Sequence, residues 1–95
     1  MRTTYVYILS SATRRLSVGY TDDIRRDLSA RRAELGSAYT DRLVYYETLI
    51  DQRMAIDRYI EIKRLPRMRK VWLIEAFNPL GDDLSSEWQW GRADG

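Results

Sequence analysis

The first half of the chain contains three short apolar runs that predict β-strands. Residues 4–9 and 16–20 contain β-branched and aromatic side chains, which fit a pleated sheet. The small polar residues between these runs predict a tight turn, so the two strands should pair as an antiparallel hairpin. Gly19 inside the second run indicates a bulge or the close approach of another group. Residues 42–49 predict a third strand.

A helical pattern follows the hairpin. Thr21 is a candidate N-cap because it precedes two aspartates, which favour the first turn of a helix. Gly36 is a candidate C-terminal stop. The apolar stripe of this predicted helix consists of Ile24, Leu28 and Leu35.

Two further helices are predicted after the third strand. Asp51 can cap the first of them, and Pro66 should end it. Its positions at helical spacing are Ile56, Tyr59, Ile60 and Lys63. Residues 67–77 predict the last helix, which should stop at Asn78-Pro79. One side of that helix is expected to carry Met68, Val71, Trp72 and Glu75.

These elements predict a small α/β domain with the order ββαβαα. Its three-stranded, mainly antiparallel sheet should be flanked by helices, and 95 residues suffice for one such domain. We assign residues 1–79 to this domain and residues 80–95 to a C-terminal tail packed on the body. Trp88 and Trp90 should hold the tail there, because large apolar rings are unfavourable in water. The alternatives for these two rings are a protein interface and a stacking platform for unpaired bases.

Composition narrows the chemistry that the chain can perform. The sequence has no cysteine and no histidine, which excludes disulfides, a cysteine nucleophile and zinc sites built on these residues. Any metal would need carboxylate ligands, which suit magnesium or manganese, and we expect no other cofactor. No apolar run approaches the roughly 20 residues of a membrane span, and no signal-peptide pattern is present. We therefore expect a cytoplasmic protein with no membrane partner.

The net charge of +2 conceals a local excess of cations. Residues 63–70, called the basic segment below, contain five cations, no acid and one proline. These cations are Lys63, Arg64, Arg67, Arg69 and Lys70. Such a segment attracts a phosphate backbone, although cations at a helix C-terminus also stabilise the helix itself. Both interpretations stay open from the sequence.

The first predicted helix also carries cations. Arg25 and Arg26 are candidate nucleic-acid contacts, but neighbouring acids offset them. Asp27 and Arg31 are spaced to form an i,i+4 ion pair, so a solvated charged face is the alternative. Nothing in the chain is suited to reading base edges. Any nucleic-acid binding should therefore be weakly sequence-specific and sensitive to salt.

Several short motifs occur in an order and spacing typical of one nuclease family. They are Tyr5-Val6-Tyr7-Ile8-Leu9, Val18-Gly19-Tyr20-Thr21-Asp22-Asp23-Ile24-Arg25-Arg26, Gly36-Ser37-Ala38-Tyr39-Thr40, Arg42-Leu43-Val44-Tyr45-Tyr46-Glu47, Ile62-Lys63, Leu73-Ile74-Glu75, Asn78-Pro79, Asp83-Leu84-Ser85 and Trp88. Together they resemble the GIY-YIG nucleases, in particular the small stand-alone bacterial branch of that superfamily. The resemblance covers nearly the whole chain. It implies a small α/β fold and metal-dependent cleavage of phosphodiesters.

The resemblance also implies which positions would carry the cleavage. The first-strand tyrosine of the family matches Tyr7. Ser17 occupies the place of the second tyrosine, and Asp27 occupies the place of the catalytic arginine. Arg31 replaces a frequent histidine, and Tyr59 replaces the metal-binding glutamate, although a phenol is no substitute for a carboxylate ligand. We therefore expect a degenerate active site that holds no metal.

Three functions remain compatible with the sequence. The first is a catalytically degenerate GIY-YIG-like domain that associates with nucleic acid, expected to be DNA, through its arginines and lysines. The second is an active endonuclease with displaced groups, in which Tyr7 and Arg26 act on the phosphate and Glu61 holds magnesium or manganese. The third is a protein-interaction module that binds a partner or a second copy of the chain as a homodimer.

Overall fold

The computed structural model describes residues 3–88, the last two of them by their backbone alone. The strands are β1 (Thr4–Ser10), β2 (Leu16–Thr21) and β3 (Arg42–Leu49), and the helices are α1 (Ile24–Leu35), α2 (Gln52–Arg64) and α3 (Arg67–Phe77). Two short 3-10 helices, η1 (Gly36–Ala38) and η2 (Leu84–Trp88), follow α1 and α3. The predicted fold class and the order ββαβαα are confirmed.

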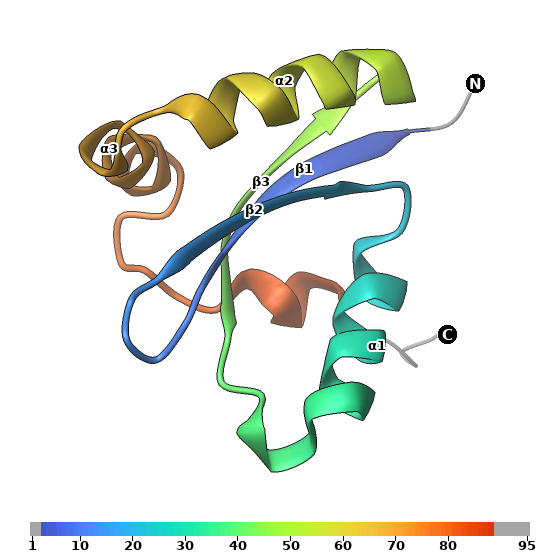
Figure 1. Cartoon of the computed structure of the whole chain (residues 1–95), viewed down its shortest axis with the longest axis vertical. Helices are drawn as coiled ribbons and strands as arrows, with labels where there is room; N and C mark the ends of the chain where they lie inside the picture. Colours follow the sequence, from blue (N-terminus) through green and yellow to red (C-terminus); the bar gives the residue numbers. More distant parts are fainter. Residues whose placement is uncertain (1–2, 89–95) are drawn as a thin grey trace.

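The sheet has β1 at its centre, with β2 and β3 paired to it in antiparallel fashion. Figure 1 shows α2 and α3 over one face of the sheet, and α1 with η2 over the other. Because successive side chains of a strand point to opposite faces, β1 supplies alternate residues to two separate cores.

Local signals set several of the element boundaries. Asp51 caps α2, and its Oδ1 accepts a hydrogen bond of 2.9 Å from the amide of Met54. Gly36 ends α1 with a φ of 55°, a conformation that glycine adopts without strain. The prediction of Thr21 as the cap of α1 is wrong by two residues. Asp23 is the N-cap, while the hydroxyl of Thr21 accepts a hydrogen bond of 3.0 Å from the amide of Asp23.

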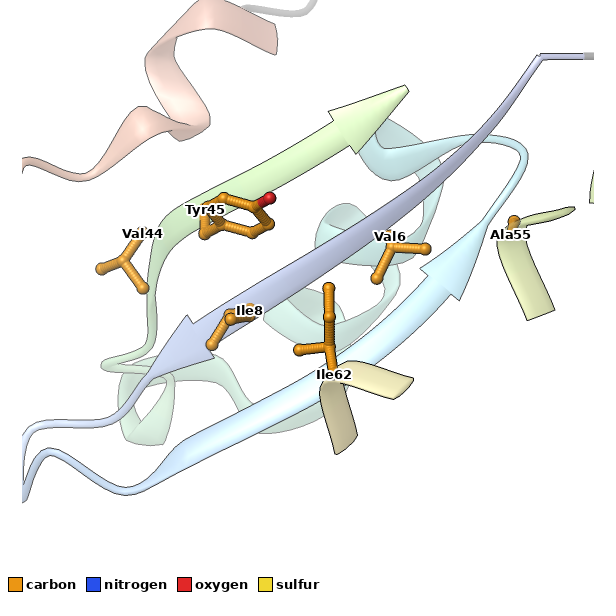
Figure 2. Packing of buried hydrophobic residues seen from close by; sticks show 6 residues of the cluster. All are labelled: Val6, Ile8, Val44, Tyr45, Ala55 and Ile62. Atoms are coloured by element: carbon orange, nitrogen blue, oxygen red, sulfur yellow. The ribbon is translucent and has the colours of Figure 1, made fainter. Parts of the chain in front are cut away.

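One core lies between the sheet and α2. Figure 2 shows its buried side chains, which are Val6, Ile8, Val44, Tyr45, Ala55 and Ile62. Among the helically spaced positions noted in α2, Ile60 is exposed. Isoleucines two residues apart on a helix are turned by about 200°, so Ile60 and Ile62 cannot both point inward. The small side chain of Ala55 lets α2 approach the sheet and favours the Ile62 side.

The second core lies between the sheet and α1. It contains Tyr7 and Leu9 of β1 together with Ile24, Leu28 and Leu43. Leu35, the third residue of the predicted stripe, is exposed instead. It lies in the last turn of α1, where the helix extends past this core.

The chain after α3 returns to the sheet through polar contacts. The Asp83 Oδ1 accepts a hydrogen bond of 3.1 Å from the amide of Leu43 in β3. Asn78 is buried, and its Nδ2 donates to the carbonyl oxygen of Val44 at 3.2 Å. The predicted packing of the Trp88 and Trp90 rings lies outside the described part of the chain. Within residues 3–88, no helix is both long enough and apolar enough to cross a bilayer.

Candidate functional site

Tyr7 occupies the centre of the sheet, where it pairs with Gly19 on β2 and Tyr46 on β3. Its side chain is buried, with 8% of the residue surface exposed. A Cβ atom added to Gly19 would lie 2.7 Å from both Cζ and Oη of Tyr7. The tyrosine ring therefore leans across β2 at the one position that lacks a side chain. The predicted close approach at Gly19 is confirmed.

The surroundings of the Tyr7 hydroxyl raise its pKa. Burial is the largest cause and the negative charge of Asp27 is the next, while the positive charge of Arg31 acts in the opposite direction. Tyr39 and Tyr59 also contribute to the rise. The phenol therefore keeps its proton at neutral pH, so it can donate a hydrogen bond but is poorly suited to act as a base. The charges of Asp27 and Arg31 therefore act on the Tyr7 hydroxyl in opposite directions.

The predicted ion pair between Asp27 and Arg31 is not found. Arg31 Nη2 instead lies 3.4 Å from Oδ2 of Asp41, in the loop before β3. The Asp27 Oδ1 lies 3.7 Å from Nη2 of Arg26. The Nε of Arg31 is buried and has no hydrogen-bond partner among residues 3–88. Folding brought a distant acid to Arg31, which local spacing could not predict.

Tyr59 lies on α2 and packs against the core on the opposite face of the sheet from the core that contains Tyr7. Its ring packs against Tyr20 of β2, with ring centroids 5.1 Å apart. The ammonium group of Lys63 donates a hydrogen bond of 3.0 Å to its hydroxyl and lies 5.3 Å from its ring centroid. Tyr59, where the resemblance to GIY-YIG nucleases implies a metal-binding glutamate, thus presents a phenol and an adjacent cation.

Ser17 lies on the same face of β2 as Gly19, because residues two apart on a strand share a face. It is exposed and pairs with Leu9. Tyr7 thus lies in the core beside α1, the helix that carries Asp27 and Arg31, whereas Tyr59 packs on the α2 side of the sheet and Ser17 is exposed on β2.

The displaced residues of the endonuclease alternative lie elsewhere. Arg26 has 61% of its side chain exposed and is 2.8 Å from Asp22. Glu61 has 64% of its side chain exposed and is 3.1 Å from Nη1 of Arg58. Glu61 follows Tyr59 by two residues, which turns it about 200° around the helix axis. It therefore points away from the side of α2 on which Tyr59 packs against the sheet.

The residues around Tyr7 do not fit a divalent metal ion. Asp27 is the carboxylate that acts most on Tyr7, and the Arg31 charge acts on the same hydroxyl. Magnesium prefers several oxygen ligands and an environment of negative charge. Within residues 3–88, no three acidic side chains gather as a metal site would require.

The basic segment spans the end of α2 and the start of α3. Four of its cations are exposed and Lys70 is half-buried. Within residues 3–88, none of the five forms an ion pair with an acid. The first turn of α3 contains no acid, and Pro66 offers no side-chain hydrogen bond to cap it. The segment is thus a surface whose charges are not neutralised by the described protein.

The side of α3 predicted to carry Met68, Val71, Trp72 and Glu75 faces largely outward. Met68 and Trp72 are exposed by 60% and 57%. Leu73 and Ile74 pack against the core. Positions 71–74 are all apolar, so periodicity alone could not identify the inward pair. The exposed tryptophan beside the basic segment is a candidate functional residue that sequence reasoning missed.

A groove of about 250 Å³ lies on the other side of α3. Three arginines line it, from the hairpin turn, β3 and α3: Arg14, Arg42 and Arg67. The Nη1 of Arg42 donates a hydrogen bond of 2.7 Å to the carbonyl oxygen of Gly81. Glu75 also lines the groove, so three arginines and one acid meet there and extend the positive surface beyond the basic segment. No local signal in the sequence indicated it.

A third polar cluster joins β3 to α2. The Nη2 of Arg58 lies 2.7 Å from Oε2 of Glu47, and the hydroxyl of Tyr45 donates to the same carboxylate. Burial raises the pKa of Glu47, but the hydrogen bonds from Arg58 and Tyr45 outweigh it, so the pKa is lowered overall. Because every member has a partner, this cluster holds the two elements together rather than forming an open site.

The fold and the basic segment together define the class of protein. It is a small α/β domain with an antiparallel sheet, a central buried tyrosine and a basic segment whose charges are not neutralised within residues 3–88. No family model matches the chain. It is 34% identical to a UPF0213 protein of Clostridium perfringens, over 76% of this chain and 83% of that protein. It is 36% identical to a UPF0213 protein of Natronomonas pharaonis, over 74% and 88%. The chain belongs to the UPF0213 family.

A solved structure supports this assignment. The solution NMR structure of a UPF0213 protein from Bacillus halodurans resembles the chain with a TM-score of 0.59 and 26% sequence identity. The similarity covers 88% of this chain and 95% of the other. Family membership therefore extends to the arrangement of the elements.

Proposed function

We propose that this protein is a nucleic-acid-binding domain, with DNA as the expected ligand, in which the cleavage chemistry of the GIY-YIG nucleases it resembles has been lost. The observation that carries the proposal is the basic segment, with five cations and no acidic partner among residues 3–88. A phosphate backbone supplies the missing negative charge.

The position of these cations argues against a purely structural role. Lys63 and Arg64 lie in the last turn of α2, where the helix dipole favours positive charge. Arg67, Arg69 and Lys70 lie at the start of α3, where the dipole disfavours it by about 0.3–1 kcal/mol for a residue in the first turn. Cations that weaken their own helix are better explained by an anionic ligand than by stability.

The loss of cleavage is supported by the region around Tyr7. Its raised pKa opposes activation of water by a phenolate. By the resemblance, Asp27 puts a negative charge where a phosphate would need a cation, and Tyr59 puts a phenol where a metal would need a carboxylate. Lys63, hydrogen-bonded to Tyr59, further disfavours a dication there. These features support the loss of cleavage.

The test is a titration of a labelled DNA duplex with the full chain, followed by fluorescence anisotropy. The triple variant Arg67→Gln, Arg69→Gln, Lys70→Gln should bind at least tenfold more weakly, since each lost phosphate contact removes favourable counterion release. A control with the same charge change carries Arg15→Gln, Arg32→Gln and Arg53→Gln, three exposed arginines outside the basic segment and outside the other candidate contacts. An equal loss in both variants would reduce the effect to net charge and refute the basic segment as the interface.

The endonuclease alternative makes a separate prediction. If Tyr7, Arg26 and Glu61 formed a working site, supercoiled plasmid would be nicked in magnesium or manganese, and Glu61→Ala would abolish the nicking. Our proposal predicts that the plasmid stays intact. Nicking that depends on Glu61 would overturn the loss of cleavage while leaving the binding surface in place.

A further inference from the structure

The outward face of α3 carries an aromatic ring that the protein core does not use. Trp72 is 57% exposed, and Met68, one turn before it, is 60% exposed. The Arg69 guanidinium carbon lies 5.8 Å from the Trp72 ring centroid. Helical side chains lean toward the N-terminal end of their helix, so the ring lies over the turn that contains the cations. A large apolar surface and unneutralised charge thus meet at one place.

We infer that Trp72 is a stacking platform for an unpaired base, and that the protein prefers single-stranded nucleic acid; this inference rests on the proposed function. The cations supply contacts for the phosphates on either side of the base, and the ring supplies a flat apolar partner for the base itself. In a duplex the bases are stacked on one another, so an exposed ring on a helix surface has no base face to meet. A single strand offers one at every nucleotide.

The positive charge beside Trp72 favours a nucleic acid over a protein as the ligand. An exposed tryptophan and methionine alone would suit any apolar surface. Here the neighbouring turn carries Arg67, Arg69 and Lys70 with no acid, so the occupant must be anionic along its length. Arg69 beside the ring also adds a planar cation on which a base can stack. A regular polyanion with exposed planar bases satisfies both requirements.

The experiment compares three ligands with the full chain: a single strand of about 15 nucleotides, a duplex of the same length, and an abasic strand with the same sugar-phosphate backbone. The variants are Trp72→Leu, which keeps an apolar side chain, and Trp72→Phe, which keeps a ring. Trp72→Leu should weaken binding to the single strand by about 5- to 150-fold, the range found for one stacked base. Trp72→Phe should recover much of that loss. Neither variant should alter binding to the duplex or to the abasic strand.

The outcomes separate this inference from the proposed function. If the wild type binds all three ligands and Trp72→Leu leaves its affinity for the single strand unchanged, the inference fails and nucleic-acid binding stands. An equal loss on the abasic strand would also overturn it, because no base is then involved. If the wild type binds none of the ligands, the proposed function fails. A dimeric mass in light scattering that Trp72→Leu converts to a monomer would show that a second copy covers the ring, and would overturn the assignment.

Discussion

The contact between Tyr7 and Gly19 is tight enough that a single methyl group should disturb it. A Cβ at position 19 would lie 2.7 Å from the tyrosine ring, and Tyr7 has little free space because it is buried between β2 and α1. Gly19→Ala should therefore lower the free energy of unfolding by about 1–3 kcal/mol, the usual cost of overpacking. Urea denaturation would measure it.

A double-mutant cycle tests the cause of that loss. In a Tyr7→Leu background the ring is absent, so Gly19→Ala should cost little and the two changes should not add. If the cost of Gly19→Ala is the same in both backgrounds, the ring is not the obstacle and the account of this contact is wrong.

At the scale of elements, the polar cluster of Glu47, Arg58 and Tyr45 links β3 to α2. The ionisation of Glu47 makes the stability of this link depend on pH. The folded-state pKa of Glu47 is lowered, so its ionised form stabilises the fold above the usual carboxyl value of 4.5. That stability is lost as pH falls through the lowered folded pKa. Glu47→Gln should therefore flatten the fall of the unfolding free energy as pH drops below about 4.5. An acid profile with the same slope in the variant and the wild type would contradict this origin.

The two halves of the basic segment should respond to neutralisation with opposite signs. Arg67 is the first residue of α3 and Arg64 is the last of α2. Arg67→Gln should raise the free energy of unfolding by a few tenths to about 1 kcal/mol, and Arg64→Gln should lower it by a similar amount. Thermal unfolding at low salt would measure both. A loss of stability in both variants would show that Arg67 serves the fold.

How far the elements could be predicted depends on how local their causes are. Asp51 acts through its side chain on the next turn, and Gly36 and Pro66 act through their own backbone, so the end of α1 and both ends of α2 could be predicted from the sequence. The inward faces of α2 and α3 could not, because each helix offers two competing apolar sides. The choice of Ile62 over Ile60 depends on the fit of Ala55 against the sheet, which is a tertiary property.

The candidate site likewise has features that the sequence could predict and features that it could not. The sequence identified the basic segment because its charges are adjacent along the chain. It did not identify the pairing of Arg31 with Asp41 or the exposure of Trp72, since both depend on how distant segments pack. The boundary drawn at residue 79 and the roles assigned to Tyr7, Ser17, Asp27, Arg31 and Tyr59 stay predictions.

For the whole molecule, the important property is where charge lies and not how much there is. Sixteen cations and fourteen acids give a net charge of only +2. The basic segment and the groove lined by Arg14, Arg42 and Arg67 nevertheless form a surface with few acids. This surface lies on the side of α3, away from the Tyr7 neighbourhood between α1 and β2. Binding can therefore persist in a protein whose cleavage centre has been lost.

The most direct test of this account is the salt dependence of DNA binding. The logarithm of the association constant for a duplex should fall linearly with the logarithm of salt concentration, by about 0.9 per neutralised phosphate. The account predicts a slope between roughly −3 and −5 for the wild type, and a slope shallower by about 2 to 3 in the Arg67→Gln, Arg69→Gln, Lys70→Gln variant. A wild-type affinity that does not change with salt, or a slope that the variant shares, would contradict it.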